Sequence, residues 1–357
     1  MAEDINRGMC SRGHEVTVLT SRMKGLPGDL KEGNLRVMRV SCLRRQPFRA
    51  TFLSMAAYLL VGLVPALRLL HTWRPDLIHV HFAVPAGALA WMLQRLTNIP
   101  YVLTTHLGDV PGGVPEKTSH WFRLVYPFTH RIWREARQVV AVSAFTRQLA
   151  LVHYTVSIRV ILNGVDLHNI KPSRKKVDQI PRIIFAGRFI EQKNPVQIVR
   201  SLAELDGLAW QCVMVGDGPL LEKVEQEINA RGLKERFTLT GWIPPQEVLA
   251  WFDRSDILFM PSLSEGLPVV GVQALAKGLA IVVSRIGGFL DIVDDQENGF
   301  LVDSTDPTGF SSALRKLLVS RNALQKCQRA SLAKAKQFDI NRVVAQYESI
   351  FKDVAHG

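Results

Sequence analysis

The sequence predicts an α/β protein made of two Rossmann-like domains, each with a parallel, doubly wound sheet. Short apolar strand patterns alternate with helical patterns from residue 14 to residue 162, and this alternation restarts at residue 182. The length of 357 residues suits two domains of ordinary size. A polar, charged segment at 166–180 separates the two stretches and is interpreted as a linker. We therefore expect domains at residues 1–167 and 168–338, and a last helix within 339–357 that could cross back to the first domain.

Each predicted strand of the first domain is a short apolar run that ends at polar residues, Gly or Pro. Arg12-Gly13 is a typical helix stop directly before the first strand. Helical patterns cover Pro85 to Leu96 and Trp121 to Arg137. The predicted strands are residues 14–20, 35–40, 77–82, 101–105, 138–143 and 158–162.

The second domain repeats this alternation. Its predicted strands are residues 182–187, 211–215, 237–241, 257–260 and 279–284. Its predicted helices start at Pro195 and Pro268 or cover 219–231, 246–253 and 306–336, and a last helix covers 339–355. Open parallel sheets bind ligands beyond the carboxyl ends of their strands, so we expect a site in a cleft where the two domains face each other.

The formal net charge of +12 is concentrated in the first half of the chain. Residues 1–170 hold 20 Lys and Arg against 10 Asp and Glu, a surplus of 10, whereas the remainder holds 24 against 22. A basic half favours an anionic partner, such as an acidic lipid surface or a phosphorylated acceptor. No nucleic-acid motif accompanies it, so a nucleic-acid partner is not predicted. Scattered solvated charge is the alternative interpretation.

The cysteines and the first residues indicate a reducing compartment. Cys10, Cys42, Cys212 and Cys327 are far apart and form no Cys-x-x-Cys pair, which argues against disulfides and a zinc cluster. The first ten residues are mostly polar, so no signal peptide is predicted. We expect a cytoplasmic location.

The most apolar stretch is TFLSMAAYLLVGLVPALRLLHTW, residues 51–73. A glycine, a proline and an arginine interrupt it, so no membrane span is predicted. A core helix is the first interpretation. The alternative is peripheral contact with an anionic membrane through residues 44–71 and the loop 107–122, in which Arg44, Arg45 and Arg49 meet the headgroups.

The stretch from Ser262 to Gly288 combines a Glu-Gly turn with a helix start. Pro268 suits the first helical position, and the N–H groups from Gly266 onward favour an anion. Glu265 lies beside them and Gln273 further along the same helix. This pattern is typical of a site for a phosphorylated, hydroxyl-rich ligand. The alternative is that Glu265 caps the helix and Gln273 is a surface residue.

Two cations follow the first strand of the second domain. Gly187-Arg188 ends this strand, and Lys193 comes five residues later, directly before a helix. An arginine fork and a lysine point charge suit a diphosphate, and two ordinary surface cations are the alternative. VGDGP at 215–219 lacks the full dinucleotide fingerprint, so a nicotinamide site is not predicted. In GWIP at 241–244, the backbone or Trp242 could meet a flat base, or Trp242 could simply pack.

Three histidines are expected at strands of the first domain. His106 follows a strand and could act as a hydrogen-bonding or acid/base group in the cleft, or be a satisfied core histidine. His79 and His81 alternate along another strand. A metal site formed with His106 is a weaker alternative, because no carboxylate or cysteine spacing supports it.

Taken together, these motifs resemble the family-four, retaining nucleotide-sugar glycosyltransferases of GT-B architecture. The resemblance covers nearly the whole chain. Each fragment is short, but the ordered set with its spacing is specific. The fragments are RGHEVTVLT, RPDLIHVH, LTTHLGD, VAVS, ILNGVD, FAGRFIEQKN, VGDGPL, GWIP, MPSLSEGLPVV and SRIGG.

The resemblance implies a role for each matching residue. It places Arg188 and Lys193 on the donor diphosphate, and Glu265 on the donor sugar together with the turn at Gly266 and Leu267. His106 matches a first-domain histidine that faces this sugar, so the implied catalytic set is Glu265, His106, Arg188 and Lys193. The resemblance also implies that the side chain at position 273 contacts the ribose and that the backbone near residues 242 and 243 contacts the base. The remaining implied donor-binding residues are Gly216, Trp242, Ile243, Pro268 and Gln273.

The implied reaction is front-face attack by an acceptor hydroxyl, with retention at the anomeric carbon. Arg188, Lys193 and the helix start would stabilise the charge that develops on the leaving diphosphate, so neither a divalent metal nor another cofactor is expected. The implied partners are a nucleotide-sugar donor and a glycan or lipid-linked acceptor. The implied setting is the assembly of surface polysaccharide, glycolipid or lipopolysaccharide, in the cytoplasm or on the inner face of the plasma membrane.

The chain departs from the family pattern in two places. Gln273 stands where the family has a second glutamate, and this difference predicts weaker binding of the donor. Met1 falls inside the first helix, so the family's first strand and its Gly-rich loop are missing. We expect an N-terminally truncated or mis-started chain in which the strand at 14–20 lacks a neighbour. A catalytically impaired nucleotide- or sugar-binding remnant is therefore the alternative function, and a nucleotide-sugar epimerase is a weaker one.

Overall fold

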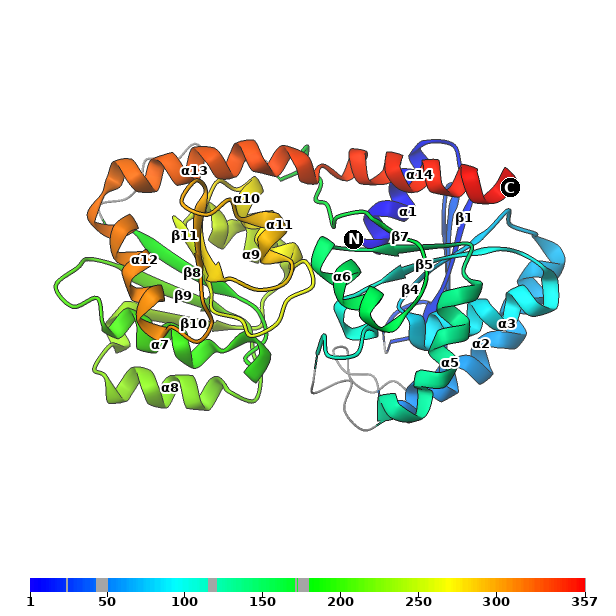
Figure 1. Cartoon of the computed structure of the whole chain (residues 1–357), viewed down its shortest axis with the longest axis horizontal. Helices are drawn as coiled ribbons and strands as arrows, with labels where there is room; N and C mark the ends of the chain where they lie inside the picture. The colour runs from blue at the N-terminus through cyan, green and yellow to red at the C-terminus, as the bar shows by residue number, and fades with distance from the viewer. Residues whose placement is uncertain (24, 43–50, 115–120, 171, 173–179, 357) are drawn as a thin grey trace. The chain divides into compact units, whose positions relative to one another are not determined.

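The computed structural model describes residues 1–23, 25–42, 51–114, 121–170, 172 and 180–356 (Figure 1). Arg44, Arg45, Arg49 and most of the predicted linker lie outside these residues. The chain divides into two units, which are described separately. Unit 1 consists of Met1–Leu162 and Ile340–Gly357, and unit 2 of Asn163–Asp339.

The division comes five residues before the predicted boundary at 167. Two hydrogen bonds explain this difference, because they tie residues 163–165 to unit 2. The Asn163 amide donates to the Leu267 carbonyl at 2.9 Å, and the Val165 N–H donates to the Phe338 carbonyl at 2.8 Å.

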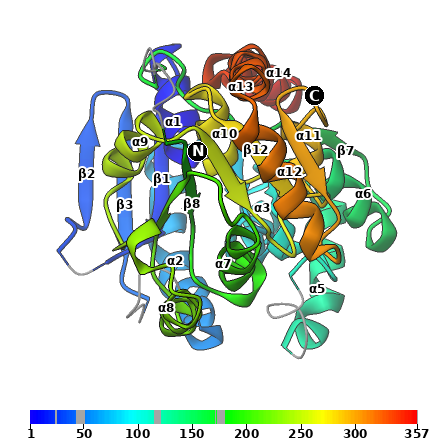
Figure 2. The same ribbon diagram turned by 90° about the vertical axis from the view of Figure 1, so that its left-hand side faces the viewer.

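Unit 1 contains two sheets formed by the described residues. In the first, β1 (Val16–Ser21) pairs in parallel with β3 (Leu35–Val40), and β2 (Asp29–Glu32) pairs antiparallel with β3 (Figure 2). The second sheet has the order β4-β5-β6-β7, and all its neighbours are parallel. Its strands are β4 (Ile78–His81), β5 (Tyr101–Thr105), β6 (Gln138–Ala141) and β7 (Ile158–Val160).

Among the described residues, the edge strands of the two sheets of unit 1 are β1, β2, β4 and β7. Within the described part of the chain, β1 is hydrogen-bonded to β3 alone and β4 to β5 alone. Every residue of β1 is also partly exposed. Strands of a doubly covered parallel sheet are ordinarily buried, so this open edge agrees with the expectation for the strand at 14–20.

The helices of unit 1 cover its sheets. Helices α1 and α14 pack together over β5 and β6, where Met9, Val344 and Tyr347 meet Val102 and Val140 in one core cluster. Chain segments from the two ends of the sequence therefore build one core, and the last helix belongs to unit 1. The helices are α1 (Ala2–Ser11), α2 (Phe52–Thr72), α3 (Ala88–Thr97), α5 (Trp121–Glu135), α6 (Ala144–His153) and α14 (Ile340–His356).

Helix α2 contains the apolar stretch singled out in the sequence. By length and composition, the segment Leu53–Thr72 could cross a membrane. Among the described residues, no other helix meets this criterion. Thr51 caps its start with a capping box. One face packs into the core through Tyr58 and Ala66, and the Tyr58 hydroxyl donates to the Leu19 carbonyl at 3.1 Å. The interpretation as a core helix therefore holds for one face.

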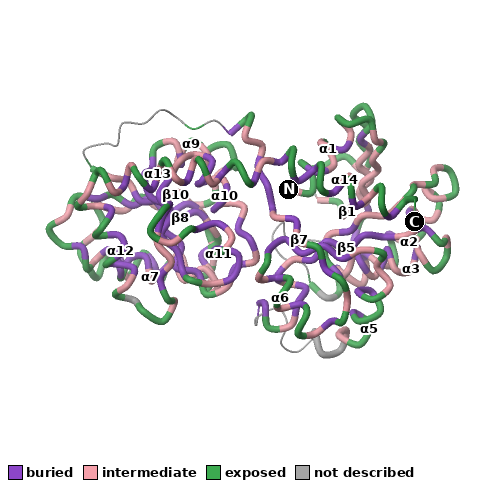
Figure 3. Tube along the Cα trace, turned by 45° about the horizontal axis from the view of Figure 1, so that its top comes forward, coloured by how far each residue is buried: buried purple, intermediate pink, exposed green. Residues whose placement is uncertain are grey.

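Unit 2 is built on one parallel sheet with the strand order β10-β9-β8-β11-β12-β13. Its central strands are buried, as the tube in Figure 3 shows. The strands are β8 (Arg182–Ala186), β9 (Gln211–Val215), β10 (Phe237–Gly241), β11 (Ile257–Met260), β12 (Ala280–Ser284) and β13 (Gly299–Val302). The helices are α7 (Pro195–Ala203), α8 (Leu221–Ala230), α9 (Pro245–Asp253), α10 (Val269–Ala276), α11 (Phe289–Ile292), α12 (Pro307–Val319) and α13 (Arg321–Ala335).

The predicted parallel α/β architecture is confirmed, with local differences. The predicted helix 306–336 is two helices, because Ser320 adopts an extended backbone and its side chain caps α13 through the Ala323 N–H. Strands β2 and β13 were not predicted. All four residues of β2 are exposed, so its sequence lacks the apolar alternation on which the prediction depended.

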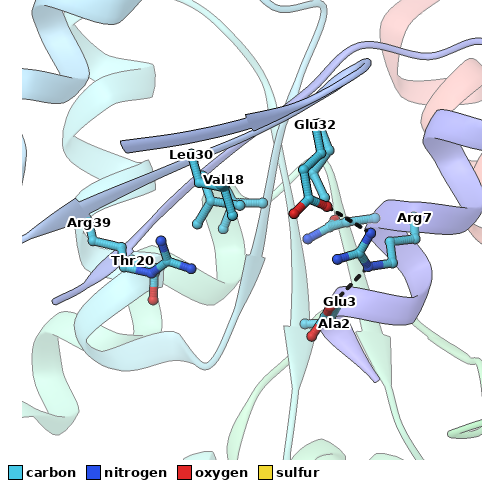
Figure 4. A pocket seen from close by; sticks show the side chains of 11 residues that line it. Ala2, Glu3, Arg7, Val18, Thr20, Leu30, Glu32 and Arg39 are labelled. Carbon is cyan, nitrogen blue, oxygen red and sulfur yellow. Dashed lines mark hydrogen bonds and ion pairs between the residues drawn. The ribbon is translucent and has the colours of Figure 1, made fainter. Parts of the chain in front are cut away.

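A pocket of about 330 Å³ lies over the first sheet of unit 1, beside α1 (Figure 4). At its α1 side, Arg7 forms ion pairs with Glu3 at 2.9 Å and with Glu32 at 3.1 Å. None of the predicted site residues lines this pocket. Its apolar lining consists of Ala2 of α1 and of four residues from the three strands, Val18, Leu30, Leu35 and Val37.

Candidate functional site

Loops of unit 2 meet at the carboxyl end of its sheet, because β10, β9, β8 and β11 are neighbours. The Gly187 N–H donates to the Val215 carbonyl and the Gly216 N–H to the Gly241 carbonyl, both at 2.9 Å. Gly216 has a φ of +131°, and a Cβ there would lie 1.9 Å from the Gly187 oxygen. Only glycine therefore fits at position 216. The loops after β8, β9 and β10 approach one another more closely than side chains would permit.

The loop after β11 joins this group through the turn that carries Lys193. The Leu263 N–H donates to the Gln192 carbonyl at 2.8 Å, and the Gln192 side-chain amide donates to the Ser264 carbonyl at 2.8 Å. Gln192 thus binds the loop after β11 twice, through its backbone carbonyl and through its side-chain amide. Gln192 had no predicted role, although it lies inside the FIEQKN motif.

Lys193 and Glu265 form a direct ion pair. The Lys193 Nζ lies 2.5 Å from the Glu265 Oε1, and the two side chains are only 15% and 6% exposed. The family resemblance implied Lys193 on the donor diphosphate and Glu265 on the donor sugar, and their direct pairing was not predicted. A buried pair of this kind leaves a costly uncompensated charge when one partner is removed. The charge of Lys193 is therefore balanced by the protein itself.

Two further residues hold the loop that carries Glu265, and neither was predicted. The buried Asn163 donates to the Leu267 carbonyl at 2.9 Å, and the Gly288 N–H donates to the Glu265 carbonyl at 3.0 Å. A Cβ at Gly288 would lie 1.8 Å from the Gly266 oxygen, so the two backbones touch. The motifs ILNGVD and SRIGG contain these residues, but motif matching alone could not show what they contact.

The other predicted residues of unit 2 lie in the loops after β8 and β10 and on α10. Arg188 is exposed at the start of the loop after β8, and Trp242 is 61% exposed after β10. Ile243 is half-buried, Pro268 is the N-cap of α10, and Gln273 lies half-buried within that helix. Among the described residues, no hydrogen bond or ion pair joins Arg188 or Gln273 to the Lys193–Glu265 pair.

His106 belongs to unit 1 and lies at the carboxyl end of β5. Its ring stacks on Phe82 with the centroids 4.3 Å apart, and its Nε2 lies 3.3 Å from the Nδ1 of His81. Phe82 has a φ of +74°, a strained conformation for a non-glycine residue that is typical of functional sites. The Asp109 carboxylate accepts from the N–H groups of His106 and Ala83, both at 2.9 Å. Asp109, which had no predicted role, therefore joins the ends of β4 and β5.

Burial keeps this group of histidines uncharged near neutral pH. Burial, together with the neighbouring His81 ring, lowers the pKa of His106 to about 3, and burial lowers the pKa of His81 to about 4. One neutral ring must donate and the other accept in the His81–His106 contact, so their proton positions are coupled. His106 is thus suited to neutral hydrogen bonding rather than to carrying a positive charge.

The histidines do not converge as metal ligands. The His79 Nε2 lies 2.8 Å from the Thr104 hydroxyl, and the nearest ring nitrogens of His81 and His106 face each other. Across the part of the chain that the structure describes, no group of three or more His, Cys, Asp or Glu side chains could hold a metal ion.

Comparison with known families accounts for nearly all of the chain. Residues 1–169 match the model of Glycosyltransferase Family 4, and residues 168–334 match that of Glycosyl transferases group 1. The chain belongs to the group 1 glycosyltransferases with the GT-B fold. The motifs around Lys193, Glu265 and Gly288 fall within the second match.

Similar proteins include enzymes that act on different acceptors. This glycosyltransferase is 26% identical over 377 residues to a D-inositol 3-phosphate glycosyltransferase of Corynebacterium diphtheriae, covering 98% of the chain and 88% of the relative. It is 28% identical over 280 residues to an Escherichia coli UDP-Gal:alpha-D-GlcNAc-diphosphoundecaprenol alpha-1,3-galactosyltransferase, covering 71% and 69%.

Solved structures share the fold. Sucrose-phosphate synthase from Thermosynechococcus elongatus matches with a TM-score of 0.85 at 19% identity, covering 99% of this chain and 92% of that one. The Anabaena protein HepE in complex with UDP-glucose matches with a TM-score of 0.75 at 17% identity, covering 94% and 99%. The expectation of a GT-B glycosyltransferase is thereby confirmed.

Proposed function

We propose that this glycosyltransferase moves a sugar from a nucleotide-sugar donor to an acceptor hydroxyl, with retention and without a metal ion. The observation that carries the proposal is the buried Lys193–Glu265 pair at the carboxyl end of the unit 2 sheet. It puts a cation and a carboxylate side by side at the edge where open α/β sheets bind ligands. A donor has matching chemistry, because its diphosphate needs a cation and its sugar hydroxyls need an acceptor.

The pair has a defined task when a donor diphosphate binds. Lys193 must turn part of its hydrogen bonding from Glu265 to the phosphate oxygens, which releases the carboxylate to accept from a sugar hydroxyl. As the glycosidic bond breaks, negative charge grows on the leaving diphosphate, and a lysine already held in place stabilises it without reorganisation. Exposed Arg188 adds a second cation in the same group of loops. Protein cations thereby take the place of a metal ion.

Two further predicted contacts belong to this proposal. Gln273, on α10, donates to and accepts from the ribose hydroxyls, without the charge that a glutamate would add. His106 offers a neutral ring nitrogen to the donor sugar, a state that its burial maintains. Because His106 lies in the other unit, this contact stays a prediction.

The proposed setting is the assembly of surface polysaccharide, glycolipid or lipopolysaccharide at the inner face of the plasma membrane. Support comes from the relative that acts on a diphosphoundecaprenol-linked sugar and from the basic first half of the chain. An acceptor that carries a diphosphate would be attracted by such a charge.

A screen of nucleotide sugars tests the proposal. The purified protein is incubated with each donor and a panel of lipid-linked and soluble sugar acceptors, and release of nucleoside diphosphate is measured with and without EDTA. We expect release with at least one donor, unchanged by EDTA, and a product whose anomeric signal in NMR matches that of the donor. Inversion at the anomeric carbon or full loss of activity in EDTA would overturn the mechanism.

The open strand edges of unit 1 favour one alternative, a remnant that binds nucleotides but does not transfer sugar. The two functions separate in one experiment. Calorimetric binding of a nucleoside diphosphate with no turnover of any donor supports the remnant, and turnover excludes it.

A further inference from the structure

Helix α2 has an outer face that the protein leaves uncovered. While Tyr58 and Ala66 are buried, Leu53 is 67% exposed, Leu60 77% and Val64 51%. At 100° per residue these three positions fall within about 40° of one another around the helix axis, so they form one apolar stripe. Single exposed apolar residues are ordinary, but a continuous stripe over three turns marks a contact surface.

The stripe continues into two polar residues, one of which is a cation. Arg68 and His71, which follow along the same face, are both exposed, and the helix contains no acidic residue. Apolar side chains of such a stripe can enter the headgroup–acyl boundary of a bilayer while the adjacent arginine meets anionic headgroups.

Two neighbouring helices also expose apolar side chains and contain arginines. Helix α3 packs on α2 and α5 packs on α3, and the three lie together in Figure 1. They expose the apolar side chains of Leu96 and Phe128. Their sequences contain five arginines, at 68, 95, 123, 131 and 134, and one acidic residue, Glu135, which is paired with Arg95 at 2.6 Å.

The charge balance decides which occupant fits. A second copy of the chain joined through this surface by a two-fold axis would place like charges opposite one another, which costs free energy. A bilayer with anionic headgroups instead offers the opposite charge at the rim and a hydrocarbon phase for the stripe. Each arginine near such a surface strengthens binding by about fivefold.

We infer that the outer surface of α2, α3 and α5 docks this protein on an anionic membrane, with Leu53, Leu60 and Val64 entering the headgroup–acyl boundary. The inference does not depend on the donor site. Arg44, Arg45 and Arg49, which precede α2 in the sequence, lie outside the described residues and are not part of it.

The loop 107–122 is left out of this surface. This loop was expected to share the membrane contact. Leu107, Val110 and Val114 are instead at most 5% exposed, because they pack inside unit 1. Residues 115–120 lie outside the described part, so the proposed surface is limited to the three helices.

Vesicle sedimentation tests the inference. The full chain is mixed with vesicles of phosphatidylcholine alone or with one-third phosphatidylglycerol, and the partition coefficient is measured. We expect binding to the anionic vesicles, at least about tenfold stronger than to the neutral ones, from several arginines that each contribute about fivefold. Arg68→Gln should lower only the binding to anionic vesicles, by about fivefold.

A pair of matched variants locates the contact. Leu60→Gln/Val64→Gln should lower the partition coefficient by about tenfold or more, because both side chains lose apolar burial. Leu290→Gln/Val319→Gln changes two similarly exposed residues of unit 2 and should leave partitioning within about twofold. Circular dichroism melting confirms that each variant is folded.

Several results would overturn the inference. They are binding to neither kind of vesicle, equal binding to both, or a Leu60→Gln/Val64→Gln variant that partitions like the original. Light scattering after size exclusion tests the competing occupant. If the protein binds no vesicles but forms a dimer, and if the Leu60→Gln/Val64→Gln variant dissociates this dimer, the surface would be assigned to a second copy of the chain.

Discussion

Replacing Glu265 by Gln should strengthen the binding of a nucleoside diphosphate while it abolishes sugar transfer. In the ligand-free protein Lys193 is bound to Glu265 at 2.5 Å, so a diphosphate must compete with a carboxylate for the same cation. Coulomb's law at this separation gives an attraction on the order of 6 kcal/mol for an effective dielectric constant of about 20. Most of it is offset by desolvation, but the competition remains.

The magnitude follows from the charge that the substitution removes. A carboxylate about 6 Å from a phosphate repels it by about 1–3 kcal/mol at effective dielectric constants between about 20 and 80. Glu265→Gln should therefore tighten diphosphate binding by about fivefold to a hundredfold. Lys193→Met should weaken it by about tenfold to a hundredfold, because a charge-assisted hydrogen bond is lost.

Isothermal titration calorimetry with a nucleoside diphosphate measures both effects. Glu191→Gln is the matched control, since it removes an exposed acidic charge from the same turn but no partner of Lys193. If Glu191→Gln tightens binding as much as Glu265→Gln, the effect is general electrostatics rather than competition. If Glu265→Gln binds the diphosphate no better than the original chain and is equally stable, the reasoning about Lys193 is wrong.

Three other predictions concern two residues of unit 2 and the histidines of unit 1. Gln273→Glu should strengthen donor binding by about fivefold, because it adds a charge-assisted hydrogen bond to the ribose, and an unchanged donor affinity in calorimetry would contradict this role. Gly288→Ala should lower both the melting temperature and the transfer rate at a cost of about 1–3 kcal/mol, because its Cβ would lie 1.8 Å from the Gly266 oxygen; a fully stable variant would refute this close approach. The free energy of unfolding should fall as the pH drops from about 6.5 toward 4. In the folded protein the pKa of His106 is about 3 and that of His81 about 4, whereas both are near 6.5 in the unfolded chain. The unfolded chain therefore binds protons at these histidines first, which favours unfolding. In urea titrations across this range, His81→Gln should show a smaller fall, and an identical slope would exclude a contribution from His81.

Much of the architecture follows from local patterns in the sequence. Alternating strand and helix patterns specify parallel sheets, because a strand that returns parallel to its predecessor needs a crossover. Parallel strands bring their carboxyl ends to one edge, so Lys193 and Glu265, which follow β8 and β11, could be expected at the same edge. The helix start at Pro268 was also predictable, because proline suits only the first turn.

Contacts between distant residues were not predictable in this way. Lys193 pairs with Glu265 because β8 lies beside β11 in the sheet, and strand order is not encoded in the period of a hydrophobic pattern. The same limit applies to His81 and His106, whose contact needs β4 beside β5. The missed strand β2 is exposed and polar, so no burial imposed a pattern on it.

By itself, the sequence determined the fold class, the family and the residue types at the ends of the strands. These properties depend on local periodicity and on short motifs that each form a turn or a helix start. Only the tertiary structure decided that Glu265 is held by Lys193, that Gly288 touches Gly266, and that α2 is buried on one face and open on the other. The physical reason is that charge pairing, close backbone approach and burial depend on which segments become neighbours, and that order is set by the packing of the whole sheet.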